Sequence, residues 1–354
     1  MALLDRDRMP VRFSVVTSVL SGLIVAISLK ALSVGLAGGF VVLWGLLPIG
    51  GAAVAGLALG RIRGRHPQVF LMVSTFSRKY QVSAFVQHLH NSLDRNGIDL
   101  VLKAAEREFD ASAQSHHLSR ILSRRSHYLG GVITPAEVDR LRDDLVAFCR
   151  NFRKPIVFTD LEPFDKVEEY PENTAYIGYD TGRLGELAGE WLAKKLRDKN
   201  RPHVLIIAGH EHSARQRRCE DALRSALPDV DLVIDAGCEF IRSRAHVAVR
   251  AHIQRLPAGQ HLDAIYCTSD EMALGAVDAL RPPSPVTEDT LVIGTDGITE
   301  VKELIQTAQS PLKATVVQDE DRLAWSIVDL LRKMCSGRPV PKRTILPGQI
   351  HEAP

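Results

Sequence analysis

The stretch AIYCTSDEMALGAVDAL, from Ala264 to Leu280, carries the clearest signal of secondary structure in this chain. It opens with a short apolar run typical of a buried strand and continues with the spacing typical of a helix. Ser269 and Asp270 stand at the junction, where Ser or Asp accepts hydrogen bonds from the first helical turn. Such junctions also line the ligand crevice of open α/β sheets. The stretch therefore predicts a parallel sheet flanked by helices, with Ser269 as the cap and Asp270 facing a crevice.

The alternation of strand and helix patterns extends over most of the chain. Apolar runs such as QVFLMVSTFS and HVLIIAGH are each followed by a helical pattern, for example VSAFVQHLHNSLDRNG and SARQRRCEDALRSAL. This regularity is typical of parallel sheets covered by helices on both faces. About ten strands in roughly 285 residues exceed what one small sheet needs. We therefore predict an α/β fold of two doubly wound lobes with a cleft between them.

Composition excludes several classes of function. The net charge is +2, with 24% charged residues, so no basic surface points to a nucleic-acid partner. The five cysteines are scattered and form no C-x-x-C pair, which disfavours a disulfide framework or a metal–thiolate site. Their pattern suits a reducing compartment.

The N-terminal region is strongly apolar. From Phe13 to Gly60 the only charge is Lys30, and a single helix of this length would measure about 70 Å, roughly twice the hydrocarbon core. We predict a transmembrane hairpin at 13–60, with a cytoplasmic N-terminus at 1–12 and a basic linker at 61–67.

Arginines at both ends of the hairpin predict its orientation, namely Arg6, Arg8, Arg12, Arg61, Arg63 and Arg65. Positive residues favour the cytoplasmic side, so the sequence predicts a multi-pass inner-membrane protein with its large domain in the cytoplasm. Two alternatives remain. A single span would place the domain outside, and a cleavable signal peptide would need a cleavage site that the sequence does not clearly provide.

Motifs for catalysis, cofactors and metals are absent from the sequence. The glycines of GYDTGRLGELAGE (178–190) do not have the G-x-G-x-x-G spacing, and we expect them to allow close helix packing instead. His210, Glu211 and His212 lack a further ligand cluster. There is no H-E-x-x-H, no G-x-S-x-G and no P-loop. We therefore predict no enzyme activity, no cofactor and no metal.

Polar residues recur at the carboxyl ends of the predicted strands, where they converge on one crevice. They are Ser77, Tyr80, Asp160, Asp270, Asp296 and Gln318, together with Arg218 on the helix after HVLIIAGH. Carboxylates with a guanidinium and an amide suit a neutral polyhydroxylated ligand, because each ligand hydroxyl can donate to one group and accept from another. Aromatic residues that can cover the apolar face of a sugar ring are Phe76, Tyr80, Phe164 and Phe240.

Four stretches together resemble the type I periplasmic binding proteins, such as ribose-binding protein and the effector domains of lac-repressor-type regulators. They are AIYCTSDEMALGAVDAL, VIGTDGITEVKELIQ, LKATVVQD and YIGYDTGRLGELAGEWLAKKL. The resemblance covers about residues 68–345 and implies two Rossmann-like lobes joined by three hinge crossovers, which close on a small ligand. We place lobe 1 at about 68–173 and 319–336, lobe 2 at about 174–318 and 337–345, and a tail at 346–354.

The resemblance also implies roles for individual residues. Asp270 would bind sugar hydroxyls, Arg218 matches an arginine of the family, Gln318 a hinge glutamine, and Asp160 the aspartate that ends the strand before the first crossover. FSRKYQ (76–81) departs from the family, which often has Asn-Pro and paired aromatics there. The sequence therefore does not specify a ribose-like ligand.

These features predict a membrane-anchored, non-catalytic binding protein for a sugar or a similar small polar solute. One alternative is the substrate-binding component of an ABC-type sugar transporter, with the domain outside the membrane and a permease as partner. The other is an intracellular sensor that signals through a partner. The expected partners are the small solute, membrane lipid along residues 13–60, and a permease or signalling protein, with no nucleic acid.

Overall fold

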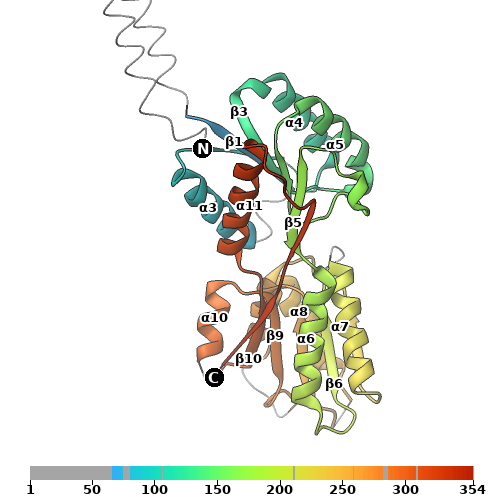
Figure 1. Ribbon diagram of the computed structural model, residues 1–354. Helices are drawn as coiled ribbons and strands as arrows, with labels where there is room; N and C mark the ends of the chain where they lie inside the picture. Colours follow the sequence, from blue (N-terminus) through green and yellow to red (C-terminus); the bar gives the residue numbers. More distant parts are fainter. Residues whose placement is uncertain are drawn as a thin grey trace, which may run out of the picture. The chain divides into compact units, whose positions relative to one another are not determined.

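The computed structural model describes residues 66–74, 80–105, 107, 109–209, 212–257, 259–281, 286–307 and 310–353. The hairpin predicted at 13–60 lies outside these residues, as do Phe76 and Ser77. Residues 68–354 form one compact unit (Figure 1). In the part of this unit that is described, the strands form two six-stranded sheets, each with helices packed against it.

The first sheet belongs to lobe 1 and is parallel throughout. Its strands, in spatial order, are β11 (Arg343–Leu346), β5 (Thr174–Tyr179), β4 (Ile156–Phe158), β3 (Tyr128–Ile133), β1 (Gln68–Val73) and β2 (Asp99–Ala104). The helices of this lobe are α3 (Tyr80–Asp94), α4 (Ala111–Ser123), α5 (Val138–Phe152) and α11 (Glu320–Cys335), with the short 3-10 helices η1 (Arg125–His127) and η2 (Val167–Glu169). Helices α3 and α11 pack together, and so do α4 and α5.

The second sheet belongs to lobe 2. Its strands, in spatial order, are β12 (Gln349–Glu352), β10 (Leu312–Val317), β9 (Leu291–Asp296), β8 (Ala264–Cys267), β6 (His203–Ile207) and β7 (Asp231–Asp235). Its helices are α6 (Thr181–Leu196), α7 (Ser213–Ala226), α8 (Arg242–Arg255), α9 (Asp270–Ala279) and α10 (Thr299–Gln306). The strands pair in parallel except for β12, which is antiparallel to β10. The predicted α/β fold of two lobes with parallel sheets is thus confirmed.

The chain crosses between the sheets after β5, after β10 and after β11. Three strands lie in another part of the fold than the predicted lobe boundaries gave them. Strand β5, which we had assigned to lobe 2, is buried along its whole length and pairs with β4 in lobe 1, so the polar stretch before it is a loop within that lobe. Strand β11 also pairs in lobe 1, and β12, which we had assigned to the tail, is an edge strand of lobe 2.

Two of the crossovers end in aspartates that cap helices. Asp180 accepts a hydrogen bond from the N–H of Arg183 at 3.0 Å and so begins α6. Asp319 accepts one from the N–H of Arg322 at 2.9 Å and begins α11. The hydroxyl of Tyr179 donates to the carbonyl of Asp319 at 3.0 Å, which ties these two crossovers to each other. The crossovers are therefore short, because each one leads directly into a capped helix.

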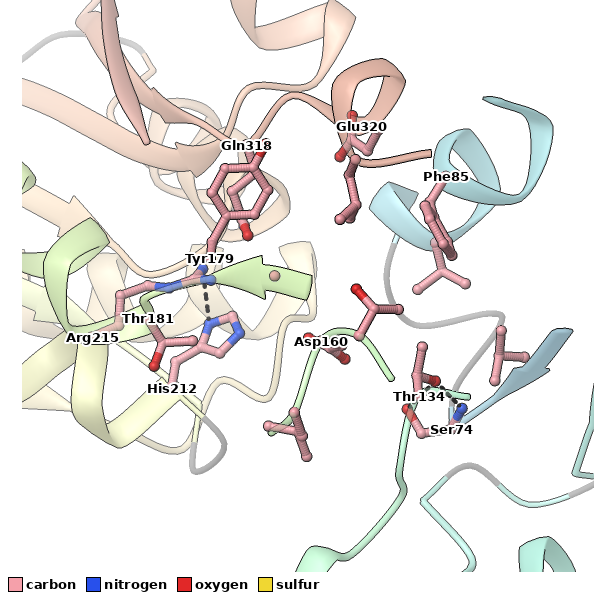
Figure 2. Close-up of a pocket in the computed structure, with 16 residues that line it drawn as sticks. Ser74, Phe85, Thr134, Asp160, Tyr179, Thr181, His212, Arg215, Gln318 and Glu320 are labelled. Carbon is pink, nitrogen blue, oxygen red and sulfur yellow. Dashed lines mark hydrogen bonds between the residues drawn. The ribbon is translucent and has the colours of Figure 1, made fainter. Parts of the chain in front are cut away.

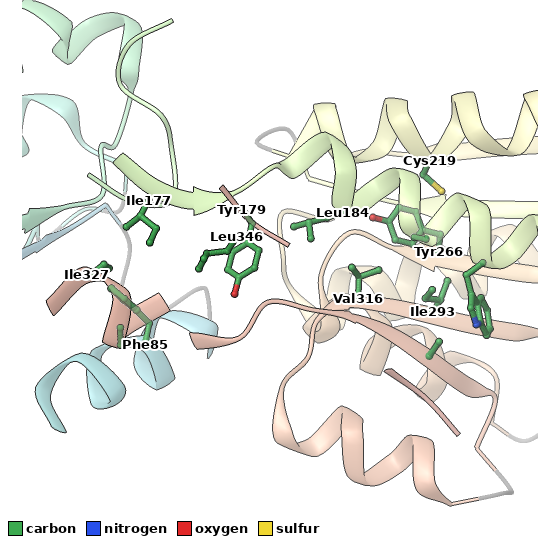
Figure 3. Close-up of a cluster of buried hydrophobic side chains, with 14 of the residues drawn as sticks. Phe85, Ile177, Tyr179, Leu184, Cys219, Tyr266, Ile293, Val316, Ile327 and Leu346 are labelled. Atoms are coloured by element: carbon green, nitrogen blue, oxygen red, sulfur yellow. The ribbon is translucent and has the colours of Figure 1, made fainter. Parts of the chain in front are cut away.

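A continuous apolar cluster passes from one lobe to the other through the crossovers. Figure 3 shows Phe85 and Ile327 of lobe 1, Tyr179 and Leu346 at the crossovers, and Leu184 of lobe 2. Each lobe also has a cluster of its own, around α4 and α5 in lobe 1 and around α8 and α9 in lobe 2.

Helices α6 and α7 approach closely because of two glycines. A Cβ atom added to Gly185 would overlap the carbonyl oxygen of Arg215, and one added to Gly189 would lie 2.7 Å from the carbonyl oxygen of Cys219. The prediction that the glycines of this segment allow close helix packing is therefore confirmed for Gly185 and Gly189, whereas Gly178 lies in β5 and Gly182 meets side chains only. The contact fixes the position of α7 at Arg215.

Replacing Gly185 by Ala should destabilise the protein by about 2 kcal/mol, because the methyl group would push α7 away from α6. Urea unfolding of the full-length protein measures the change. Gly182→Ala in the same helix is the matched control. Its added Cβ would lie 3.2 Å from the side chain of Arg218 and 3.3 Å from the carboxylate of Asp180, and both are side chains that can shift by a few tenths of an ångström. We expect a change within about 0.5 kcal/mol for the control, and equal stability of the two variants would contradict the close contact.

Strand β12 is fastened to α6 through Glu352. The indole N–H of Trp191 donates to its carboxylate at 2.7 Å, and the Lys195 ammonium lies 3.1 Å away. These contacts lower the pKa of Glu352 from its ordinary value of 4.5. A carboxyl group with a lowered folded pKa contributes stability above its unfolded pKa and loses that contribution as the pH falls through the folded value.

Glu352→Gln should therefore be less stable than the unmodified protein at neutral pH and equally stable at about pH 3. The difference should stay below about 1 kcal/mol, because the side chain of Glu352 is 43% exposed. Urea unfolding across this pH range measures it. Glu303→Gln, at an exposed position of α10, is the control and should show no such convergence. A difference for Glu352→Gln that persisted at low pH would argue against the carboxylate contacts.

Candidate functional site

A cavity that is partly open to solvent lies at the carboxyl ends of the strands (Figure 2). Residues of lobe 1, of the crossovers and of lobe 2 all line it. Its position is the one that open α/β sheets use for ligands. Figure 2 shows Arg215 and His212 on one side of the cavity and Phe85 and Thr134 on the other.

The lobe 1 wall carries hydroxyl groups. Ser74, Thr134 and Thr159 immediately follow β1, β3 and β4, and all three line the cavity. The N–H of Ser74 donates to the hydroxyl oxygen of Thr134 at 2.9 Å. The hydroxyl of Thr159 is buried and has no hydrogen-bond partner among the described residues. Sequence reasoning missed these three residues, although a hydroxyl directly after each apolar run was the signal that could have found them.

The lobe 2 wall is built around Arg215, which is 3% exposed. Its Nη1 donates to the carbonyl of Thr268 at 2.6 Å and to the carboxylate of Asp296 at 3.4 Å. Its Nε atom is buried and has no hydrogen-bond partner in the described part of the chain. A buried guanidinium N–H without an acceptor is costly, so this atom is suited to donate to a ligand.

His212 lies beside Arg215 at the start of α7. Its Nδ1 is 2.9 Å from the carbonyl of Thr268, to which the tautomer protonated at Nδ1 would donate, and 3.4 Å from Nη1 of Arg215. The ring of Phe240 packs against it edge to face, with 4.4 Å between ring centroids. From the sequence we had expected no metal site at His212, and His210 and Glu211 lie outside the described residues.

An apolar surface forms part of the cavity on the lobe 1 side. Val82 and Phe85 of α3 and Leu323 of α11 contribute to it, together with Val73 at the end of β1. The cavity thus offers polar groups on one side and an apolar surface on another, which is the combination that small-molecule sites use.

Two of the predicted ligand-binding residues line the cavity. Asp160 follows β4 with φ of 66°, and its carbonyl accepts a hydrogen bond from the Tyr176 hydroxyl at 3.1 Å. Gln318 follows β10, and its Nε2 donates to the Asp296 carboxylate at 3.0 Å. Tyr80 begins α3, and Ser77 lies outside the described residues, so their roles stay predictions.

Three predicted residues do not line the cavity. Arg218 lies on the exposed side of α7, where its guanidinium is 3.4 Å from the Glu186 carboxylate. It is Arg215, almost one helical turn earlier, that faces inward. Asp270 is fully buried, and Asp296, 7% exposed, lies behind Arg215 and Gln318. The predicted cap is confirmed, since Ser269 Oγ accepts from the N–H of Met272 at 3.4 Å, but Asp270 does not face the cavity.

The aromatic residues proposed for sugar stacking lie elsewhere. Phe164 is buried in lobe 1, with 4.9 Å between its ring centroid and that of Tyr170. Phe240 is not among the residues that line the cavity, and its ring packs against His212, which is. Phe76 lies outside the described residues. Among the described aromatic side chains, those that line the cavity are Phe85 and Tyr179.

Comparison with known proteins identifies relatives of this chain. A model of the periplasmic binding protein domain matches residues 70–339. The D-allose-binding periplasmic protein of Escherichia coli is 26% identical over 230 residues, which are 63% of this chain and 69% of that protein. A ribose import binding protein of Salmonella typhimurium is 21% identical over 272 residues, 77% of this chain and 86% of that protein.

A solved structure shares the fold. The periplasmic solute-binding protein of an ABC transporter from Actinobacillus succinogenes, solved with bound D-allose, superposes with a TM-score of 0.70 at 19% sequence identity. The match covers 81% of this chain and 97% of that protein.

These findings correct the predicted localisation. The matching family and the Escherichia coli relative are described as periplasmic, so the prediction of a multi-pass inner-membrane protein with a cytoplasmic domain is wrong. None of the helices in the described residues is long and apolar enough to cross a membrane. The predicted lipid contact falls on residues 13–60, outside the described part. The domain model matches well over half of the 354 residues, and the chain belongs to the periplasmic binding protein domain family.

Proposed function

We propose that this protein is a non-catalytic binding protein for a sugar or a similar small polar solute, on which its two lobes close by hinge motion. The observation that supports the proposal is a pair of cavity-lining residues from opposite lobes, Arg215 and Thr159. Each has a buried polar atom, Nε and Oγ1 respectively, without a hydrogen-bond partner among the described residues. Buried polar groups are nearly always hydrogen-bonded, so these atoms call for a partner that enters from solvent.

The chemistry of the walls suits hydroxyl groups. Arg215 Nε donates, the Asp160 carboxylate accepts, and the hydroxyl of Thr159 can do either. A hydroxyl can satisfy a donor and an acceptor at once, whereas an apolar solute satisfies neither. The apolar surface at Phe85 and Leu323 suits the C–H face of a ring. The named relatives that bind D-allose and ribose support this class of solute.

The comparisons are compatible with transport as the process that the binding serves. The Salmonella relative is a ribose import protein, and the solved structure is the solute-binding component of an ABC transporter. On this proposal the closed, loaded protein delivers its solute to a permease. Uptake of radiolabelled D-allose or D-ribose by cells with and without the gene tests this step. If the two kinds of cell took up each sugar equally well, the result would argue against a role in transport.

The full-length protein should be stabilised against heat by D-allose or D-ribose. Binding to the folded state alone adds about 2.7 kcal/mol when the solute is present at a hundred times its Kd, which corresponds to several degrees in Tm. Differential scanning fluorimetry measures the shift, and citrate is the control, because an anion in the cavity would meet the carboxylate of Asp160. If no neutral sugar or polyol in a broad panel shifted Tm, the proposed solute class would be wrong.

Arg215→Lys should weaken binding of the stabilising sugar at least tenfold, because lysine keeps the charge but loses the Nε–H donor, and a charged hydrogen bond contributes about 1.5–3 kcal/mol. Arg218→Lys is the matched control on the same helix and should bind normally, since Arg218 is exposed outside the cavity. Isothermal titration calorimetry gives both affinities. If only Arg218→Lys bound the sugar more weakly, then Arg218 and not Arg215 would be the arginine that contacts the ligand.

A further inference from the structure

A fully buried carboxylate lies beneath the lobe 2 wall of the cavity. Asp270, at the start of α9, is 0% exposed and does not line the cavity. One of its oxygens accepts hydrogen bonds from the backbone N–H groups of Gly297 and Ile298, at 2.7 and 2.9 Å. The other accepts from the hydroxyl of Thr315 on β10, at 2.7 Å. The carboxylate therefore joins α9 to β10 and to the turn that follows β9.

The space for this carboxylate is provided by a glycine on the neighbouring strand. A Cβ atom added to Gly294 of β9 would overlap Oδ1 of Asp270. Any other residue at 294 would displace the carboxyl group. The Asp270 carboxylate therefore fills the space next to Gly294 where another residue would have its side chain, and this close fit constrains its position.

The turn held by Asp270 has an unusual backbone. Asp296 has φ of 129° and Gly297 has φ of 81°, both in the region that side chains other than glycine seldom adopt. A non-glycine residue in such a conformation persists where its surroundings enforce it. The two backbone hydrogen bonds to Asp270 supply that restraint immediately after Asp296.

Asp296, in the restrained turn, also forms hydrogen bonds with two residues of the cavity wall. Its Oδ1 accepts from Nε2 of Gln318 at 3.0 Å and from Nη1 of Arg215 at 3.4 Å. Both donors belong to residues that line the cavity. The polar groups thus form three layers, with Asp270 innermost, Asp296 next, and Arg215 and Gln318 at the surface of the cavity.

We propose that Asp270 is a positioning residue: it holds the turn at 296–298 and, through Asp296, orients Arg215 and Gln318 toward the ligand without touching the ligand itself. The inference rests on the proposed solute-binding function and adds that affinity depends on the ionised state of a carboxyl group outside the cavity.

The ionised form is the one that the hydrogen bonds require. Three donors point at the two oxygens of Asp270, and protonation would turn one acceptor into a donor. Burial, followed by the nearby Asp296 carboxylate, raises the pKa of Asp270 to about 7. The other ionisable groups that face this pair are Cys267 at the end of β8, a neutral thiol whose pKa burial raises, and Arg215 of α7. As the pH falls through about 7, Asp270 takes up a proton, the turn loosens and affinity should fall.

The first experiment compares D-allose binding by the full-length protein and by Asp270→Asn, using calorimetry from about pH 5.5 to about pH 8.5. We expect the unmodified protein to lose about tenfold in affinity toward the acidic end. Asp270→Asn should bind at least about tenfold more weakly at the alkaline end and should lack this slope. Ser269→Ala is the matched control. It removes only the cap of α9, so it should lower Tm while leaving the pH profile of affinity unchanged.

Thr315→Val provides a milder variant in case Asp270→Asn does not fold. It removes one donor to the carboxylate, so the midpoint of the pH profile should move to higher pH. An Asp270→Asn protein that folds and binds D-allose with the normal affinity and slope would overturn the proposal. An unchanged midpoint in Thr315→Val would do the same.

Hydrogen exchange of the ligand-free protein separates this proposal from the proposed function. The Gly297 and Ile298 amides should exchange at least about tenfold faster in Asp270→Asn or, if that variant does not fold, in Thr315→Val. The amides of β6 should not change in either variant. Suppose that neither D-allose nor D-ribose binds the unmodified protein, but the Gly297 and Ile298 amides exchange faster in the variant. The proposed solute class is then wrong, and the positioning role of Asp270 is supported. If the amides stay protected, the positioning role is wrong whatever the protein binds.

Discussion

The passage of the chain between two separate sheets at three points is the constraint on which the site depends. Each crossover leaves a strand at its carboxyl end, so the carboxyl ends of both sheets are brought to the same region. The cavity is formed there, and the residues that follow β1, β3, β4 and β10 line it without any need for long loops. The hydrogen bond from Tyr179 to Asp319 and the helix caps at the crossovers limit the paths that these segments can take.

The two walls of the cavity use different physical means to present polar groups. On the lobe 1 side, hydroxyls directly after the strands supply them, among apolar side chains. On the lobe 2 side, a guanidinium and an amide are held by a carboxylate that is itself nearly buried. Groups fixed in this way lose little conformational entropy when a ligand arrives, which favours both affinity and selectivity. The lobe 2 wall is thus the preorganised half of the site.

The sequence was sufficient for the fold, because strand–helix alternation is a local pattern and the four family-like stretches span the chain. It also predicted the Ser269 cap and the close packing at Gly185 and Gly189. The prediction from sequence was wrong for Asp270, because a polar residue after a strand can point into a crevice or into the core. Here the space beside Gly294 and the hydrogen bond from Thr315 place the side chain in the core.

The arginine shows a second limit of prediction from sequence. Arg215 and Arg218 lie on the same helix, and a shift of three residues separates the buried face from the exposed one. Helical periodicity does not distinguish them, because both lie in a run of charged residues. Only the contact between α6 and α7 at Gly185 shows which arginine faces inward. The predicted lobe boundaries were wrong for a similar reason, because the sequence pattern of a buried strand does not show which of the two sheets the strand joins.

The late strands β11 and β12 have a consequence for the order in which the protein folds. Arg343 pairs with Tyr176 in one sheet, and only a few residues later Glu352 pairs with Ala314 in the other. Neither sheet can gain its last strand until residues 343–352 have been synthesised. Contacts so distant in sequence form slowly, because a large loop must close first. Both lobes therefore remain incomplete until the segment 343–352 is available, and this one segment completes the two sheets.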